Sequence, residues 1–176
     1  MKMRLLISVT LAAELFASGL CPAQGTIMSN LGLTPTGSLG VGSDSWIAQQ
    51  FFSEYNANNT SAYVVTSVQL LMDPGSGNPG GFTVSIYSGS SGPQKDLGAL
   101  SGPDPSAGGL FTYTSSGITL LPYNNINPPT DYFIVVTGAT PVGQGAYAWS
   151  AESGHGDTVG NNNWFMTMFI TRRSTA

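Results

Sequence analysis

The sequence carries few charged residues. Of its 176 residues, 5 are Lys or Arg and 9 are Asp or Glu, so charged residues make up 8% of the chain, against roughly 25% in an average soluble domain. A nucleic-acid binder displaces counterions from phosphates with many cations, and this chain has 5. The low charge therefore argues against nucleic acid as a partner. It also gives little electrostatic steering, so we expect a neutral partner, either a glycan or another surface protein.

Histidine and cysteine are nearly absent as well, with one of each. A triad of nucleophile, imidazole and carboxylate would have to use His155, which stands between two glycines. A zinc site usually takes three or four His or Cys ligands. The sequence also lacks a glycine-rich loop ending in Lys-Ser or Lys-Thr, the pattern that cradles phosphates. We therefore expect a chain that is not an enzyme, with no catalytic residues and no cofactor.

The longest apolar run lies at the start of the chain. A cationic stretch, Met1–Arg4, precedes the mostly apolar residues 5–20, and small residues follow up to Ala23. This order is typical of a secretory signal peptide. We predict cleavage after Ala23 and a single mature domain at residues 24–176. The mature chain would then be secreted, extracellular or at the cell surface, without a membrane span.

Two other interpretations of residues 1–23 stay open. A lipoprotein would carry lipid on Cys21, but the residue before that cysteine is Leu20 rather than a small residue. A retained anchor would need roughly 20 apolar residues, and this run is shorter and contains Glu14. Removal of the leader would leave no cysteine, so the stability of the mature domain would depend on its core alone.

The rest of the sequence alternates short apolar stretches with turn residues, including many of the 23 Gly and 11 Pro. No stretch of ten or more residues has the 3.6-residue period of a capped helix. The expected strands are residues 46–52, 62–72, 82–86, 97–100, 110–114, 118–121, 132–137, 146–150 and 164–170. Eight or nine short strands of this kind predict an all-β fold, an antiparallel β-sandwich. We favour a jelly roll, although the pattern also fits an immunoglobulin-like topology.

Four stretches give more detailed expectations. The apolar face of residues 62–72 is expected to hold Val64, Val68, Leu70 and Met72, which alternate with residues of the other face. Residues 25–45 are expected to form an irregular lead-in, and residues 73–81, rich in Gly and Pro, a turn. Residues 132–137 are apolar on both faces, which predicts a central strand.

Aromatic residues neighbour asparagines in three expected loops. The candidate ligand-binding residues are Tyr55 with Asn58, Tyr123 with Asn124, and Trp164 with Asn162. Sugar sites use an aromatic face for the apolar side of the ring and planar amides for the hydroxyls. Asparagine is also a preferred turn residue, and the alternative interpretation makes each aromatic the first core residue of a strand. The pattern therefore fits glycan binding and ordinary turns alike.

The acidic residues suggest two further sites. Asp73 and Asn78 bring oxygen ligands close together, as in a calcium site, but the loop does not match the twelve-residue pattern with Glu at its end; a plain hairpin turn is the alternative. Glycoside hydrolysis needs two carboxylates across a cleft. Glu54 and Glu152, beside expected strands, are the best candidates for such a pair, whereas most other acids lie in or beside turns.

Nine segments in one order resemble the choice-of-anchor R domains of bacterial exported proteins. They are Ser29–Gly32, Trp46–Phe51, Leu70–Met72, Gly81–Ser88, Leu97–Gly102, Phe111–Thr114, Ile118–Leu120, Tyr132–Val136 and Tyr147–Ser150. The resemblance covers nearly the whole mature chain and implies a secreted β-sandwich module. The family is defined by its association with varied surface-anchoring tails. The apolar residues 164–170 are too few to span a bilayer, so we interpret them as the last strand and expect a freely secreted product.

These features together predict an exported, non-enzymatic bacterial surface or extracellular β-sandwich that acts through surface contacts in adhesion, matrix or envelope. Two alternatives remain. One is a carbohydrate-binding module that uses the loop aromatics and asparagines. The other is a hydrolase with an unrecognised carboxylate site.

Overall fold

The computed structural model describes residues 34–53, 57, 61–127 and 130–151, together with the backbone of residues 159–161 and 164–166. Its strands are β1 (Gly37–Val41), β2 (Trp46–Phe52), β3 (Tyr63–Gly77), β4 (Thr83–Gly89), β5 (Lys95–Leu100), β6 (Gly109–Leu120), β7 (Asp131–Thr137), β8 (Gly145–Ala151), β9 (Val159–Asn161) and β10 (Trp164–Met166). The predicted all-β class is confirmed. Within these residues, no helix is long and apolar enough to cross a membrane. The predicted signal peptide, residues 1–23, lies outside the described residues.

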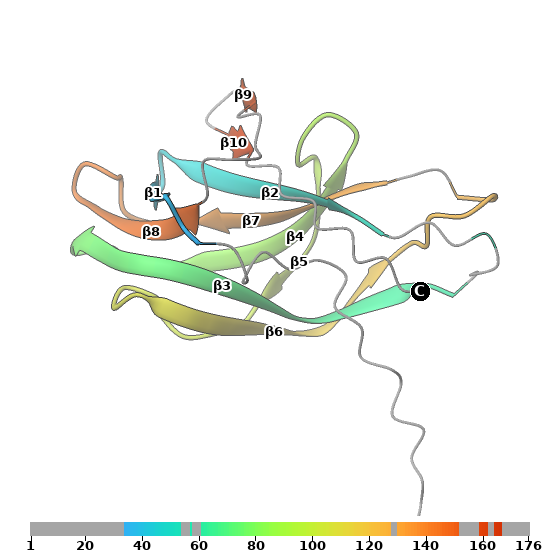
Figure 1. The fold of residues 1–176 in the computed structure, drawn as a ribbon, viewed down its shortest axis with the longest axis horizontal. Coiled ribbons are helices and arrows are strands. Elements are labelled where there is room, and N and C mark those ends of the chain that lie inside the picture. Colours follow the sequence, from blue (N-terminus) through green and yellow to red (C-terminus); the bar gives the residue numbers. More distant parts are fainter. Residues whose placement is uncertain are drawn as a thin grey trace, which may run out of the picture.

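The strands form two sheets that make a sandwich (Figure 1). One sheet has four strands in the order β1-β8-β3-β6, and the other has six in the order β5-β4-β7-β2-β10-β9. Every pair of neighbouring strands is antiparallel except β10 with β2, which is parallel. The predicted antiparallel β-sandwich is confirmed, with the short strands β9 and β10 added at one edge of the larger sheet.

The pairing of the first eight strands follows the jelly-roll pattern. The first strand pairs with the eighth, the second with the seventh, the third with the sixth and the fourth with the fifth. A chain folded back on itself in this way and wrapped into two sheets contains the two Greek keys of a jelly roll. In an immunoglobulin-like sandwich the first strand pairs with the second, whereas here β1 and β2 belong to different sheets.

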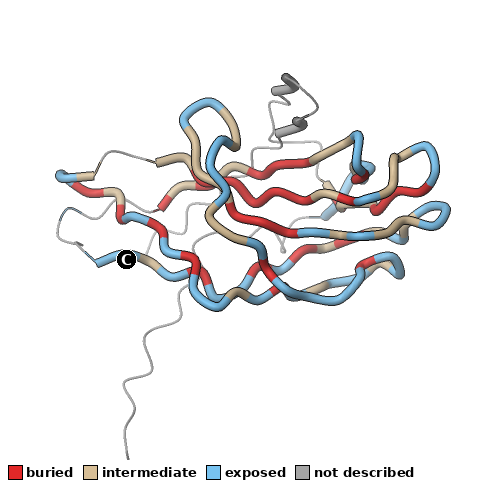
Figure 2. Tube along the Cα trace, turned by 180° about the vertical axis from the view of Figure 1, so that it is seen from behind, coloured by how far each residue is buried: buried red, intermediate tan, exposed pale blue. Residues whose placement is uncertain are grey.

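The core lies between the two sheets and is built from the inward-facing residues of both. Its most deeply buried aliphatic side chains, each exposed by 1% or less, are Val41, Ile47, Val84, Ile86, Leu120 and Val136. Figure 2 shows buried positions recurring along the central strands, while the connections between strands are mostly exposed. Burial of this apolar surface is the main favourable contribution to folding in a domain of this kind.

The expected alternation in β3 is wrong at one residue. Val64 was expected on the inner face but is 55% exposed, and its neighbour Val65 is 9% exposed. The cause is an irregularity in the β3–β6 pairing, where β3 advances two residues, from Val65 to Ser67, while β6 advances four, from Ile118 to Thr114. The alternation of the β3 side chains changes phase at this irregularity. The Ser115 hydroxyl donates a hydrogen bond to the Val65 carbonyl and so stabilises the irregular pairing.

Three expected boundaries also differ from the structure. The turn expected at residues 73–81 begins later, because β3 continues to Gly77 through a second irregularity after Asp73. Pro74 lies where pairing with β6 has ended and pairing with β8 is irregular, so its missing N–H breaks no regular ladder. Residues 110–114 and 118–121, expected as two strands, belong mostly to the single strand β6. The expected lead-in contains β1, which pairs with β8.

Candidate functional site

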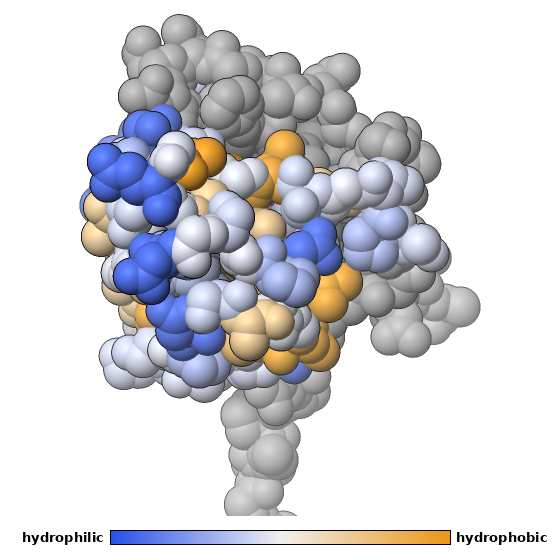
Figure 3. All heavy atoms as spheres, turned by 90° about the vertical axis from the view of Figure 1, so that its left-hand side faces the viewer, coloured by the Kyte–Doolittle hydropathy of each residue, from blue (hydrophilic) through white to orange (hydrophobic). Residues whose placement is uncertain are grey.

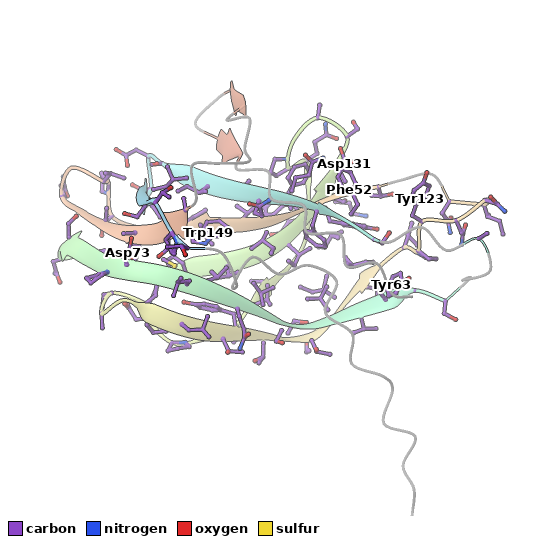
Figure 4. The ribbon with its side chains drawn as sticks, viewed as in Figure 1. Phe52, Tyr63, Asp73, Tyr123, Asp131 and Trp149 are labelled. Atoms are coloured by element: carbon purple, nitrogen blue, oxygen red, sulfur yellow. The ribbon has the colours of Figure 1, made fainter. Side chains whose placement is uncertain are left out.

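The outer face of the six-stranded sheet carries aromatic and amide side chains in cross-strand rows. In the central row, Gln50 of β2 and Tyr87 of β4 both pair with Phe133 of β7. In the next row, Phe52 of β2 pairs with Asp131 of β7. These residues alternate along their strands with core residues, so their side chains point away from the sandwich interior. Figure 4 shows Phe52 and Asp131 close together near one end of the sheet.

Part of this outer face is buried. Ala48, Phe133 and Val135 are exposed by 0%, 1% and 2% and form a hydrophobic cluster separate from the main core, with Tyr87 packed against it. Apolar residues on both faces of β7 confirm the prediction that residues 132–137 form a central strand, which lies between β4 and β2. The half-buried residues beside this cluster are Gln50, Phe52, Tyr87 and Asp131. We call these four residues the aromatic rim.

The aromatic rim combines two aromatic side chains with one carboxyl group whose pKa is raised. Burial raises the pKa of Asp131, and a hydrogen bond from the Gln50 side chain partly offsets this effect. Burial also raises the pKa of Tyr87, with a further contribution from the negative charge of Asp96. The buried Gln49 donates from Nε2 to the Gln50 carbonyl at 3.0 Å, which supports the backbone of the rim. The rim therefore offers aromatic faces, an amide and a carboxylate, and contains no cation.

The side chains of the aromatic rim have the chemistry to bind a neutral ligand. Aromatic faces contact apolar surfaces of a ligand, while amide and carboxylate groups fix the orientation of hydroxyls. Asp96 and Asp131 lie on β5 and β7, with β4 between them. Two strand spacings are about 9–10 Å, which is wider than the roughly 5–5.5 Å between the carboxylates of a retaining glycosidase and close to the upper end of the roughly 6.5–9.5 Å of an inverting one. His155, Glu54 and Glu152 lie outside the described residues.

The predicted aromatic and asparagine loop sites are only partly described. Tyr55, Asn58 and Asn162 lie outside the described residues, and only the backbone of Trp164 is described, paired with Trp46 in the register of β10 and β2. Tyr123 is half-buried and lies at the opposite end of the sandwich from Asp73 (Figure 4). The structure does not show these six residues as one group, and glycan binding at the loops stays a prediction.

Asn124 has a structural part in its loop. Its side chain is 5% exposed, and its Oδ1 accepts hydrogen bonds from the backbone N–H groups of Ile126 at 2.9 Å and Asn127 at 2.8 Å. These two bonds stabilise the turn, which is the common use of asparagine in such loops. The geometry therefore favours the turn interpretation at this asparagine.

The two predicted calcium ligands differ in their surroundings. Asp73 is half-buried on β3, and its Oδ1 accepts a hydrogen bond from the Ser150 hydroxyl at 3.1 Å. Asn78 is exposed just beyond the end of β3. In the part of the chain that the structure describes, no three His, Cys, Asp or Glu residues are grouped as metal ligands would be. A calcium ion at Asp73 and Asn78 stays a prediction.

The aromatic rim was missed in the sequence because its members come from three strands. Phe52 and Gln50 lie about 80 residues before Asp131, and only the pairing of β2 with β7 and of β7 with β4 brings them together. The apolar character of residues 132–137 on both faces was the one available signal, since it indicates that something packs on the outer face as well. It gave no indication of which polar residues would lie beside that face.

Comparisons of the chain with protein-family models, with curated proteins and with solved structures found no match.

Proposed function

We propose that this chain is an exported, non-enzymatic β-sandwich of the bacterial surface or extracellular space, which acts through surface contacts in adhesion, matrix or envelope. The observation that carries the proposal is the outer face of the four-stranded sheet. On β3 and β6 the residues on this face include Gln69, Thr112 and Thr114, with Val64 and Leu110 more than half exposed. The charged group there is Asp73, which is hydrogen-bonded to Ser150. A face of this composition suits contact with neutral partners.

The rest of the described surface supports the same proposal. Figure 3 shows one end of the sandwich, where most of the coloured surface has intermediate hydropathy and small hydrophobic and hydrophilic patches are mixed. Such a surface lacks the strong field that would steer a charged ligand. The resemblance to choice-of-anchor R domains and the predicted signal peptide point to the same extracellular setting.

Cell fractionation tests the location. The full chain, expressed in a bacterial host, is expected in the extracellular or surface fraction with its N-terminus at Gln24, which mass spectrometry of the intact protein would show. Replacement of Leu11 by Arg in the leader, which disrupts its apolar run, should hold the chain in the cytoplasm at full length. A wild-type chain found in the cytoplasm and starting at Met1 would overturn the proposed export.

An adhesion assay tests the mode of action. Cells that secrete the chain are compared with cells that secrete Gln69→Glu, a change that places a charge on the uncharged face. We expect the variant to reduce retention of cells on a polystyrene or cellulose surface. A matched variant, Asp44→Glu, keeps the charge of an exposed residue elsewhere and should retain adhesion. Equal retention with and without the wild-type chain would refute an adhesive role.

A second candidate function is glycan binding, which the aromatic rim favours. Two half-buried aromatics, Phe52 and Tyr87, lie on the same sheet face as the hydrogen-bonded pair of Gln50 and Asp131. Pull-down on insoluble cellulose, chitin and peptidoglycan tests this function. Tyr87→Ala should abolish binding if the rim is the site, whereas Tyr123→Ala should abolish it if the loops are. Absence of binding to every polysaccharide would remove this candidate and leave the proposal of surface contact in place.

A further inference from the structure

The edge of β6 leaves backbone hydrogen-bonding groups open. β6 is an edge strand of the four-stranded sheet. The N–H and the C=O of Thr114 both bond to Ser101 at 2.8 Å, so these groups point away from β3. In an antiparallel ladder this direction recurs every second residue, so the corresponding groups of Thr112 and Leu110 also point to the free edge. No backbone hydrogen bond joins these two residues to another described residue on that side.

This edge also lacks the usual protection against pairing. Proteins protect edge strands with charged side chains, prolines or bulges. β6 contains no charged residue and no proline, and its register shift lies beyond Thr114, opposite the step from Val65 to Ser67. Leu110 is 54% exposed and lies directly opposite Leu71 on the outer face. The stretch from Gly109 to Tyr113 is therefore an open, uncharged template for another strand.

We propose that a second copy of this chain pairs with this edge, β6 against β6, antiparallel about a two-fold axis at Phe111. Phe111 is the midpoint between Leu110 and Thr112. Leu110 of one copy would therefore lie opposite Thr112 of the partner subunit, and Thr112 of the first copy opposite Leu110 of the partner subunit. The N–H and C=O groups of both residues would then form four backbone hydrogen bonds across the axis. The two four-stranded sheets would join into one eight-stranded sheet.

The limits and charge of the open stretch favour a second copy as the occupant. The stretch ends on one side at Thr114, whose backbone N–H and C=O already bond to Ser101. On the other side it ends at Gly108 and Gly109, whose φ angles of 73° and 120° are not those of an extended strand. A copy centred on Phe111 fills this length. Because the strand is uncharged, a symmetric partner brings no like-charge repulsion. About five residues of each strand would meet, so we infer a concentration-dependent dimer rather than a permanent one.

Sedimentation equilibrium over a concentration series tests the dimer with the full chain. Leu110→Lys places two like charges beside the axis, and Thr112→Pro removes a donor that does not bond to β3. Each should weaken dimerisation at least about tenfold, the effect of roughly 1.4 kcal/mol. The matched controls are Val64→Lys, at 55% exposure on the same face, and Thr112→Ala, which keeps the N–H; both should dimerise like the wild type.

Cysteine cross-linking tests the register. In a Cys21→Ser background, an oxidised mixture of Leu110→Cys and Thr112→Cys should form a disulfide-linked heterodimer, because paired strands bring these positions to within the distance that a disulfide spans. Each variant alone should remain largely uncross-linked, since its two copies are offset by two residues. Circular dichroism checks that every variant folds, and the cross-link does not depend on the proline variant.

The sedimentation and cross-linking results together support or overturn the proposed dimer. Self-association weakened by Leu110→Lys but not by Val64→Lys, with the heterodimeric cross-link, supports the proposal. A monomer at all concentrations overturns it, as does a dimer that Leu110→Lys leaves unchanged. Cross-linking of Leu110→Cys with itself, in place of the heterodimer, would also overturn it, because that result requires a different register.

Discussion

The hydroxyl of Tyr147 donates a 2.8 Å hydrogen bond to Oδ2 of Asp104. Tyr147 lies on β8 and is 1% exposed, whereas Asp104 lies in the connection between β5 and β6. The other carboxylate oxygen of Asp104 accepts the backbone N–H of Ser106 at 2.9 Å. Tyr113, a second core residue, donates its hydroxyl to the Pro103 carbonyl in the same connection at 3.1 Å. Two core tyrosines therefore hold this connection against the sandwich.

The bond between Tyr147 and Asp104 gives a first prediction. Asp104→Ala leaves the buried Tyr147 hydroxyl without its acceptor, which we expect to lower the free energy of unfolding by about 1–3 kcal/mol. Tyr147→Phe removes the donor and should cost about 0.5–1.5 kcal/mol. Because both changes remove the same bond, the double variant should cost less than the sum of the two. Urea unfolding of the four proteins measures this coupling, and strict additivity would refute it.

The pH dependence of stability gives a second prediction. The Ser106 backbone N–H, and then the Tyr147 hydroxyl, hold the pKa of Asp104 below the usual value of an aspartate. A carboxyl with a lowered folded pKa contributes stability that is fully present above the unfolded pKa and is lost as the pH falls through the folded value. The free energy of unfolding should therefore decline below about pH 4, near the reference pKa of aspartate. Asp104→Asn should show a smaller decline, which urea unfolding at several pH values would measure; an unchanged slope would contradict the assignment.

Asp131 gives a third prediction, with the opposite sign. Burial raises the pKa of Asp131, so the folded state binds a proton more tightly than the unfolded state. The contribution of Asp131 to stability is then fully present below its unfolded pKa and is lost as the pH rises through its folded pKa. Asp131→Asn, which stays neutral, should remove this loss. The free energy of unfolding of the variant should therefore rise relative to that of the wild type as the pH increases from the unfolded pKa of Asp131 through its folded pKa. A difference between the two proteins that stays constant over this pH range would contradict the prediction.

The sequence was enough to predict the fold class but not every strand boundary. Residues 46–52 and 132–137 were predicted as strands because their apolar character is dense and their flanks are turn-forming, and β2 and β7 occupy these positions. The continuation of β3 through Pro74 and Gly75 was missed, because local propensity at these residues indicates a turn. The strand continues because of a tertiary contact, the pairing of Ser76 and Gly77 with Ala146 and Gly145 of β8.

The candidate site was harder to predict than the fold. The sequence drew attention to asparagines beside aromatics, and at Asn124 the structure shows an amide that stabilises its own turn. Gln50, Phe52, Tyr87 and Asp131 carry no local motif. They become neighbours only because three strands pair in a particular register, and a single sequence holds little information on such long-range pairing.

The tight passage at Gly108 gives a fourth prediction. Gly108 has φ 73°, and a Cβ there would lie 2.7 Å from the backbone nitrogen of Pro74. Gly108→Ala would combine a strained backbone, about 1–3 kcal/mol, with a clash against a backbone atom that cannot move aside easily. We expect a loss of at least that size in the free energy of unfolding. Gly37→Ala is the control, because its Cβ would meet nothing within 4 Å; equal effects of the two changes would contradict the argument.

Leu120 and Leu121, adjacent at the end of β6, give a fifth prediction. Leu120 is 0% exposed and Leu121 is 53% exposed, because consecutive residues of an extended chain point to opposite sides. Leu120→Ala should leave a cavity in the core and cost about 2–5 kcal/mol. Leu121→Ala should change stability by no more than about 0.5 kcal/mol, as is usual at exposed positions. The same side chain is removed one residue apart, so the difference measures burial alone. A larger loss at Leu121 than at Leu120 would mean that the phase of β6 is reversed and that the core is assembled from the other face.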